Sequence, residues 1–117
     1  MREVQSYEEL EVWHAGMELV QEIYGLTERF PEDEQAGITA QMRTTAIKIP
    51  AKIAGATACD NIKIALWYLA ISEGLVASLE SHLKLSVRLR YVSKVDMAPI
   101  YEKCNSIGRM IEELILS

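Results

Sequence analysis

Residues that form turns and loops are scarce in this sequence. Its 117 residues include only six glycines, three prolines and one phenylalanine, whereas half of the residues are apolar. Such a composition disfavours a turn-rich β fold and suits a helical bundle. A chain of this length buries roughly two-thirds of the surface that its unfolded form exposes, so we expect residues 1–117 to form one domain with its own core.

Cysteines and targeting segments are also sparse. Cys59 and Cys104 lie far apart and show no metal-binding spacing, which favours free thiols in a reducing compartment. The first residues lack an apolar signal core, and the longest uninterrupted apolar run, 64–71, is far shorter than the ~20 residues that span a bilayer. We therefore expect a cytoplasmic protein that does not enter a membrane.

Positive charge is in deficit, with a net charge of -5 that disfavours general attraction to phosphate backbones. The charge is unevenly distributed. Residues 1–35 hold ten acids and two bases, whereas residues 36–117 hold seven acids and ten bases. One part of the chain could therefore attract the other, within a subunit or between subunits, although a solvated acidic helix would show the same pattern.

Helical periodicity predicts four helices. The segment 61–91 is apolar over almost its whole circumference and carries no proline, so we expect it to be the central helix. The other helices are expected at 7–29, with Ser6 as the N-cap, at 38–57, and from about residue 96 to the end of the chain. Short connections favour an all-α, antiparallel, up-down-up-down four-helix bundle.

Pro50 falls in the middle of the second predicted helix. A proline there removes one backbone hydrogen bond and costs about 3 kcal/mol in an ordinary helix. Ala46, Ile49, Ile53 and Ala56 keep helical spacing on both sides of it. We therefore expect one helix that is kinked at Pro50 rather than two separate helices.

The first predicted helix carries two apolar stripes. One consists of Leu10, Trp13, Met17, Val20 and Tyr24, and the other of Val12, Leu19, Ile23 and Leu26. The second stripe favours contact with a neighbouring subunit, although one broad core face could also explain both. Gly74 inside the third helix costs up to ~1 kcal/mol unless another backbone approaches closely. The candidate subunit interface is therefore Val12, Leu19, Ile23, Leu26, Trp67 and Gly74.

Basic residues of the second and third helices are the candidates for nucleic-acid binding. One cluster is Arg43, Lys48 and Lys52 on the second helix, and the other is Lys84, Arg88, Arg90 and Lys94 around the end of the third. An oligomer would repeat each cluster as a ring that could follow a phosphate backbone, whereas solvated side chains on helix surfaces are the simpler explanation in so acidic a chain. We expect Arg43 to pair with Glu80.

Patterns for catalysis and metal binding are missing. Glu11 and His14 have the Glu-x-x-His spacing of di-iron bundles, but such sites need a second motif and two further carboxylates. The sequence contains no glycine-rich phosphate loop and no nucleophile elbow. We therefore expect no cofactor and no enzymatic activity.

Several separated motifs occur together in one order. They are Tyr7-Glu-Glu-Leu-Glu-Val-Trp13, Gly37-Ile-Thr-x-Gln-Met-Arg43, Ile47-x-Ile-Pro-Ala-x-Ile-Ala54 and Tyr68-Leu-x-Ile-x-x-Gly74. In these motifs the sequence resembles the bacterial four helix bundle protein family, also called the 23S rRNA intervening-sequence protein or S23-like family. The resemblance implies a closed antiparallel four-helix bundle that assembles as a homopentamer and has no established catalytic activity.

The same resemblance bears on nucleic-acid binding, because related bundle proteins act as accessory factors of diversity-generating retroelements through a basic surface. This sequence departs from the pattern at Thr44 and Glu73, where basic residues are frequent, and at Gly55. These departures weaken that implication. We expect a non-enzymatic oligomeric bundle with a scaffolding or interaction role. The alternative is a nucleic-acid-binding accessory protein.

Overall fold

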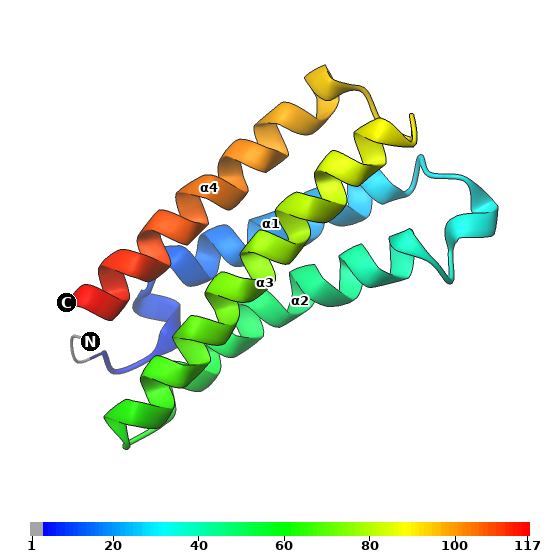
Figure 1. Cartoon of the computed structure of the whole chain (residues 1–117). Coiled ribbons are helices and arrows are strands. Elements are labelled where there is room, and N and C mark those ends of the chain that lie inside the picture. The colour runs from blue at the N-terminus through cyan, green and yellow to red at the C-terminus, as the bar shows by residue number, and fades with distance from the viewer. Residues whose placement is uncertain (1–3) are drawn as a thin grey trace.

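The computed structural model describes residues 4–117, and within this range every regular element is helical. The four α-helices lie side by side in a bundle (Figure 1), which confirms the all-α four-helix prediction. The elements are η1 (Tyr7–Glu9), α1 (Glu11–Thr27), η2 (Glu32–Glu34), α2 (Ile38–Thr57), α3 (Ile62–Arg88) and α4 (Lys94–Leu116).

Neighbouring helices of the bundle run in opposite directions. Between α2 and α3, the Ser86 hydroxyl lies 3.5 Å from the Met42 sulfur near one end. Near the other end, Lys52 Nζ lies 5.6 Å from the centroid of the Tyr68 ring. The start of α2 therefore lies beside the end of α3, and the end of α2 lies beside the start of α3. The chain path in Figure 1 shows the same arrangement.

Two helices begin where the sequence provides an N-cap. The Asn61 side chain accepts hydrogen bonds from the backbone N–H groups of Lys63 and Ile64, at 2.9 and 3.3 Å, and so caps α3. The Ser93 hydroxyl oxygen accepts from the N–H of Asp96 at 3.0 Å at the start of α4. These bonds satisfy donors that have no partner inside the helix.

The first predicted helix is shorter than expected and is preceded by a separate turn. Leu10 has an extended backbone, with φ -88° and ψ 119°, and its side chain is only 2% exposed. Burying Leu10 therefore interrupts the helix between η1 and α1. Ser6 consequently caps the short η1, where its hydroxyl accepts from Glu8 N–H at 3.2 Å.

The core contains four residues that we had assigned to a subunit interface. Val12, Leu19, Ile23 and Leu26 are each at most 5% exposed in the single chain. That assignment was wrong, because these side chains form the face of α1 that packs inside the bundle. The other stripe of α1 is more exposed. Apart from the buried Leu10, its members are partly or largely exposed, and Met17 is 44% exposed.

The N-terminal acidic helix is attracted to another helix of the same chain. On α4, Lys103 Nζ lies 3.3 Å from a carboxylate oxygen of Glu18 and 3.0 Å from one of Glu22, both on α1. Arg29 and Asp96 form a further exposed ion pair at 3.2 Å. Part of the charge asymmetry is therefore balanced within the subunit, although exposed pairs contribute little stability.

The proline inside α2 lies in a tight contact with α1. Helix α2 continues from Ile38 to Thr57 through the buried Pro50, so the two halves form one element. A methyl group placed on Gly16 would lie 3.2 Å from the Cβ of Pro50. Glycine at this position therefore lets the two helices approach closely. The kink at Pro50 stays a prediction.

Candidate functional site

The side of α3 that points away from the bundle carries an uncharged stripe. It consists of Ile64, Trp67, Ile71, Gly74, Ser78, Ser81 and Leu85, which we call the α3 outer face. These positions alternate in steps of three and four residues, so at 100° per residue they fall within an arc about 100° wide. All of these residues except the half-buried Ile71 are exposed, and in Figure 1 no other helix lies in front of α3.

Large apolar side chains lie at both ends of the α3 outer face. Trp67 is 56% exposed and Ile64 is 48% exposed near the start of α3, and Leu85 is 44% exposed near its end. Between them lie Gly74 and Ser78, and a Cβ placed on Gly74 would meet no atom of the chain within 4 Å. Such a surface has room for close approach of another backbone at its centre and apolar anchors at its ends.

The apolar character of α3 exceeds what the bundle buries. By length and composition alone, α3 is the one helix among the described residues that could cross a membrane, yet only 28% of its most apolar window is buried. The core helix of a globular protein can be equally long and apolar, but most of such a helix is buried inside the protein. Part of this surplus lies on the α3 outer face, which makes this face a candidate interaction surface.

Trp67 and Gly74 are the two predicted interface residues that lie on this surface. Ile64, Ile71 and Leu85 were missed as members of the same stripe. Their spacing was readable from the sequence, because steps of three and four residues from Trp67 reach all of them. Because the segment 61–91 is apolar on almost every side, its sequence did not indicate which stripe the other helices leave uncovered.

Arg43, one of the predicted nucleic-acid contacts, has a structural role. Its Nε donates a hydrogen bond to the Thr27 hydroxyl at 2.9 Å, and its guanidinium carbon lies 4.4 Å from the centroid of the Tyr24 ring. A longer contact of 3.4 Å reaches the Tyr24 carbonyl. Arg43 therefore stabilises the C-terminal end of α1. The expected pair with Glu80 is not among the ion pairs formed by residues 4–117.

Arg90 ends α3 through its backbone. Its φ of 65° lies in the left-handed region. The Arg90 N–H donates to the Val87 carbonyl and the Tyr91 N–H to the Ser86 carbonyl, both at 3.0 Å. This pair of bonds is the Schellman motif, in which glycine is the usual residue at the left-handed position.

The remaining predicted basic residues lie in two separate regions, as their two clusters in the sequence suggest. Lys52 lies over the Tyr68 ring, whereas Lys84 Nζ lies 5.1 Å from the centroid of the Tyr101 ring. The positions of Tyr68 and Arg88 on α3 are separated by roughly 30 Å at 1.5 Å per residue. Lys48 is exposed on α2. The bundle thus divides these cations between two distant regions.

His14 makes contacts that differ from those of a bundle metal ligand. Its Nε2 lies 2.9 Å from the backbone carbonyl oxygen of Glu8, and its ring packs edge-on against Trp13 at a centroid distance of 5.0 Å. Among residues 4–117, no three histidine, cysteine, aspartate or glutamate side chains gather as a metal ion would require.

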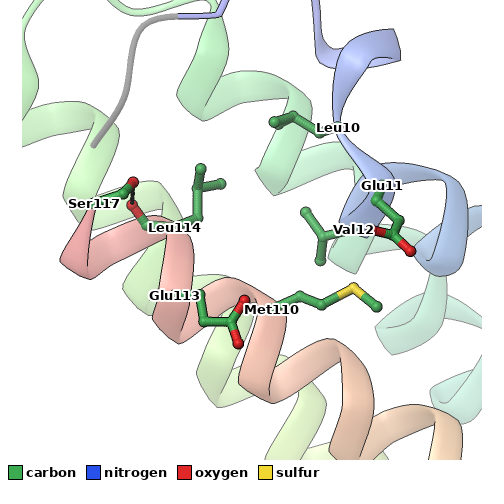
Figure 2. Close-up of a pocket in the computed structure, with 7 residues that line it drawn as sticks. All are labelled: Leu10, Glu11, Val12, Met110, Glu113, Leu114 and Ser117. Carbon is green, nitrogen blue, oxygen red and sulfur yellow. Dashed lines mark hydrogen bonds between the residues drawn. The ribbon is translucent and has the colours of Figure 1, made fainter.

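A small hollow lies where the start of α1 meets the end of α4. Its volume is about 270 Å³, and Figure 2 shows Leu10, Glu11 and Val12 across from Met110 and Glu113. Its charged side chains are two carboxylates, which disfavours an anionic ligand. The mixture of acidic and apolar groups resembles an ordinary helix end more than a reactive centre.

Among residues 4–117, a strongly shifted ionisable group lies inside the bundle. Cys104 is fully buried on α4, and its burial raises the pKa of the thiol to about 12. A thiol with so high a pKa is a poor nucleophile at neutral pH. On α3, burial lowers the pKa of His82, which favours its neutral form. Neither group lies in an arrangement suited to covalent chemistry.

Comparison with known proteins agrees with this geometry. A crystal structure of a protein of unknown function from the S23 ribosomal protein family of Bacteroides thetaiotaomicron has the same fold, with a TM-score of 0.82 and 19% sequence identity. The similarity covers 91% of this chain and 99% of that chain. No curated protein sequence matches this chain.

The sequence profile of the 23S rRNA-intervening sequence protein family matches residues 8–113, which span nearly the whole of the bundle. Neither this description nor that of the structural relative names an enzymatic activity. The match includes all of α1, α2 and α3 and α4 as far as residue 113. This chain therefore belongs to the 23S rRNA-intervening sequence protein family.

Proposed function

We propose that this chain is a non-enzymatic bundle that assembles with copies of itself through the α3 outer face and serves as a scaffold or interaction protein. The observation that supports this proposal is the exposure of Trp67, Ile64 and Leu85 along one uncharged stripe. Their burial against a second copy would remove apolar surface from water, which is the main driving force of protein association.

The spacing of the α3 outer face also favours a helix as the opposing element. Alternate steps of three and four residues produce a seam along which two helices pack. Gly74 and Ser78 at its centre would allow their backbones to approach closely, and this would offset the helix-destabilising effect of the glycine. The assembly that we propose is a homopentamer, which is the state implied by the family resemblance.

The experiment that tests this proposal is a measurement of solution mass by native mass spectrometry. A homopentamer would have a mass near 66 kDa, five times the 13.2 kDa of one chain. Another closed assembly would retain the interaction role and correct the subunit number. A 13.2 kDa monomer over the whole micromolar concentration range would refute self-assembly.

Nucleic-acid binding is the alternative proposal. Its support is that Lys48 and Arg88 are exposed, so an assembly would repeat them on its surface. Binding of single-stranded RNA or duplex DNA should then weaken steeply with salt, because each phosphate contact releases a counterion. It should be lost when Lys48, Lys52, Arg88 and Arg90 are replaced together by alanine. Salt-independent or absent binding would exclude this role.

A further inference from the structure

A groove between the end of α3 and the start of α4 lies apart from the α3 outer face. Its volume is about 450 Å³, which is within the range of ligand-binding pockets. Its apolar lining consists of Val87, Met97, Ala98 and Tyr101, which we call the floor of the groove. Such a floor suits an apolar side chain of a binding partner, and methionine adapts readily to different shapes.

Three cations on the rim of this groove lack a carboxylate partner. Lys84, Arg88 and Lys94 all line it, and among residues 4–117 none of them has a carboxylate oxygen within 4.0 Å. One carboxylate, that of Glu102, also lines the groove. The rim is therefore cationic in a chain whose net charge is -5. Lys84 is additionally held over the Tyr101 ring.

We propose that this groove binds an acidic amphipathic helix of a partner protein. Lys84 and Arg88 are one turn apart on α3, about 6 Å along its axis. Carboxylates at positions i and i+4 of a partner helix have the same separation, and an apolar stripe beside them on that helix would enter the floor. Lys94 on α4 supplies a cation on the opposite side of the groove.

The same features disfavour the other occupants. A nucleic acid would place phosphates near Glu102 and would find few hydrogen-bond donors for its bases on a floor of Val87, Met97 and Ala98. A small anion would engage one or two cations and leave the apolar floor uncovered. An acidic amphipathic helix matches the cations and the floor together.

The test uses the full chain and a fluorescein-labelled helical peptide of about four turns, in which leucines repeat every three or four positions between glutamates. Fluorescence anisotropy measures its binding to the wild-type protein. Two further probes are the same peptide with lysines in place of the glutamates and a labelled single-stranded RNA. The variants are Arg88→Glu, which reverses a rim charge, and Ala98→Trp, which fills the floor from an exposed position.

Lys63→Glu is the matched control, because it reverses the same charge at an exposed position near the other end of α3. The wild type and this control should bind the glutamate peptide alike. Arg88→Glu should weaken binding roughly tenfold or more, because it replaces an attraction to the glutamates by a repulsion. Ala98→Trp should abolish binding while the helical content and the mass of the assembly stay those of the wild type.

Four results would overturn the proposal. They are no binding of the glutamate peptide by the wild type, equal binding of the lysine peptide, binding that survives Ala98→Trp, and tighter binding of RNA through Arg88. Peptide binding in this groove does not depend on self-assembly through the α3 outer face. Native mass spectrometry tests self-assembly, whereas fluorescence anisotropy tests peptide binding, so either proposal can fail without the other. Peptide binding only by a variant that no longer assembles would assign the groove to a contact between subunits.

Discussion

Replacing Trp67 by alanine tests whether the α3 outer face holds subunits together. Trp67 is 56% exposed in the single chain. Complete burial of an aromatic side chain removes about 150–250 Å² from water, so about 80–140 Å² remains available for burial in an assembly. At ~25 cal/mol per Å², this area corresponds to about 2–3.5 kcal/mol for each subunit contact.

The expected result of Trp67→Ala is dissociation at low micromolar concentration. A loss of about 2–3.5 kcal/mol weakens each contact roughly thirtyfold to several-hundredfold. Native mass spectrometry should then show mainly the 13.2 kDa chain. Circular dichroism should show unchanged helical content, because the replaced side chain is largely outside the core. As a control, Leu116→Ala removes apolar surface that is 79% exposed on α4, and it should leave the mass unchanged.

A second variant separates the loss of an interface from damage to the fold. Gly74→Leu adds a side chain where the single chain has no atom within 4 Å of the new Cβ, so the subunit should keep its fold. The added bulk should prevent close approach of another helix and dissociate the assembly. If Trp67→Ala and Gly74→Leu both retained the mass of the wild type, the α3 outer face would not be the interface.

Three other predictions concern the stability of the chain. Gly16→Ala should lower the free energy of unfolding by about 1 kcal/mol in urea titrations, because the added methyl group would press on Pro50 at 3.2 Å. Gly25→Ala on the same helix has no such contact within 4 Å and should raise the free energy of unfolding by up to ~1 kcal/mol. Equal effects of the two substitutions would contradict the tight contact. Arg90→Gly should raise the Tm by about 3–5 °C in thermal melts, since the left-handed φ of 65° costs a residue with a side chain about 1 kcal/mol, and a lower Tm would count against this explanation. Cys104, whose pKa burial raises to about 12, should resist iodoacetamide in the folded protein and react in urea. Because only the unfolded state loses that thiol proton between about pH 9 and pH 12, its burial should make stability fall as the pH rises through this range, and replacing Cys104 by alanine should remove that part of the pH dependence.

The number of helices and most of their limits were predictable from local patterns. The second helix was expected at 38–57, and α2 extends from Ile38 to Thr57. The start of α3 follows from Asn61, whose side chain provides the hydrogen bonds that the first turn lacks. Such signals act within a few residues of one another, so they can be recognised without knowledge of the neighbouring helices.

The candidate site was only partly predictable. Trp67 and Gly74 were recognised from their residue types, whereas Ile64 and Leu85 on the same stripe were not distinguished from core residues. The cations Lys84, Arg88 and Lys94 were grouped from the sequence, but the groove beside them was not predicted. Lys84 and Tyr101 come from different helices and meet only when α3 packs against α4.

The sequence by itself determined that four helices form and where the N-caps of α3 and α4 lie, because periodicity and capping are local properties of the chain. Only the tertiary structure decided that Val12 and Ile23 enter the core while Met17 remains exposed. It also decided that Leu10 interrupts the first helix and that the α3 outer face remains uncovered. The physical reason is that periodicity defines the stripes of a helix, whereas burial depends on which stripe meets a neighbour.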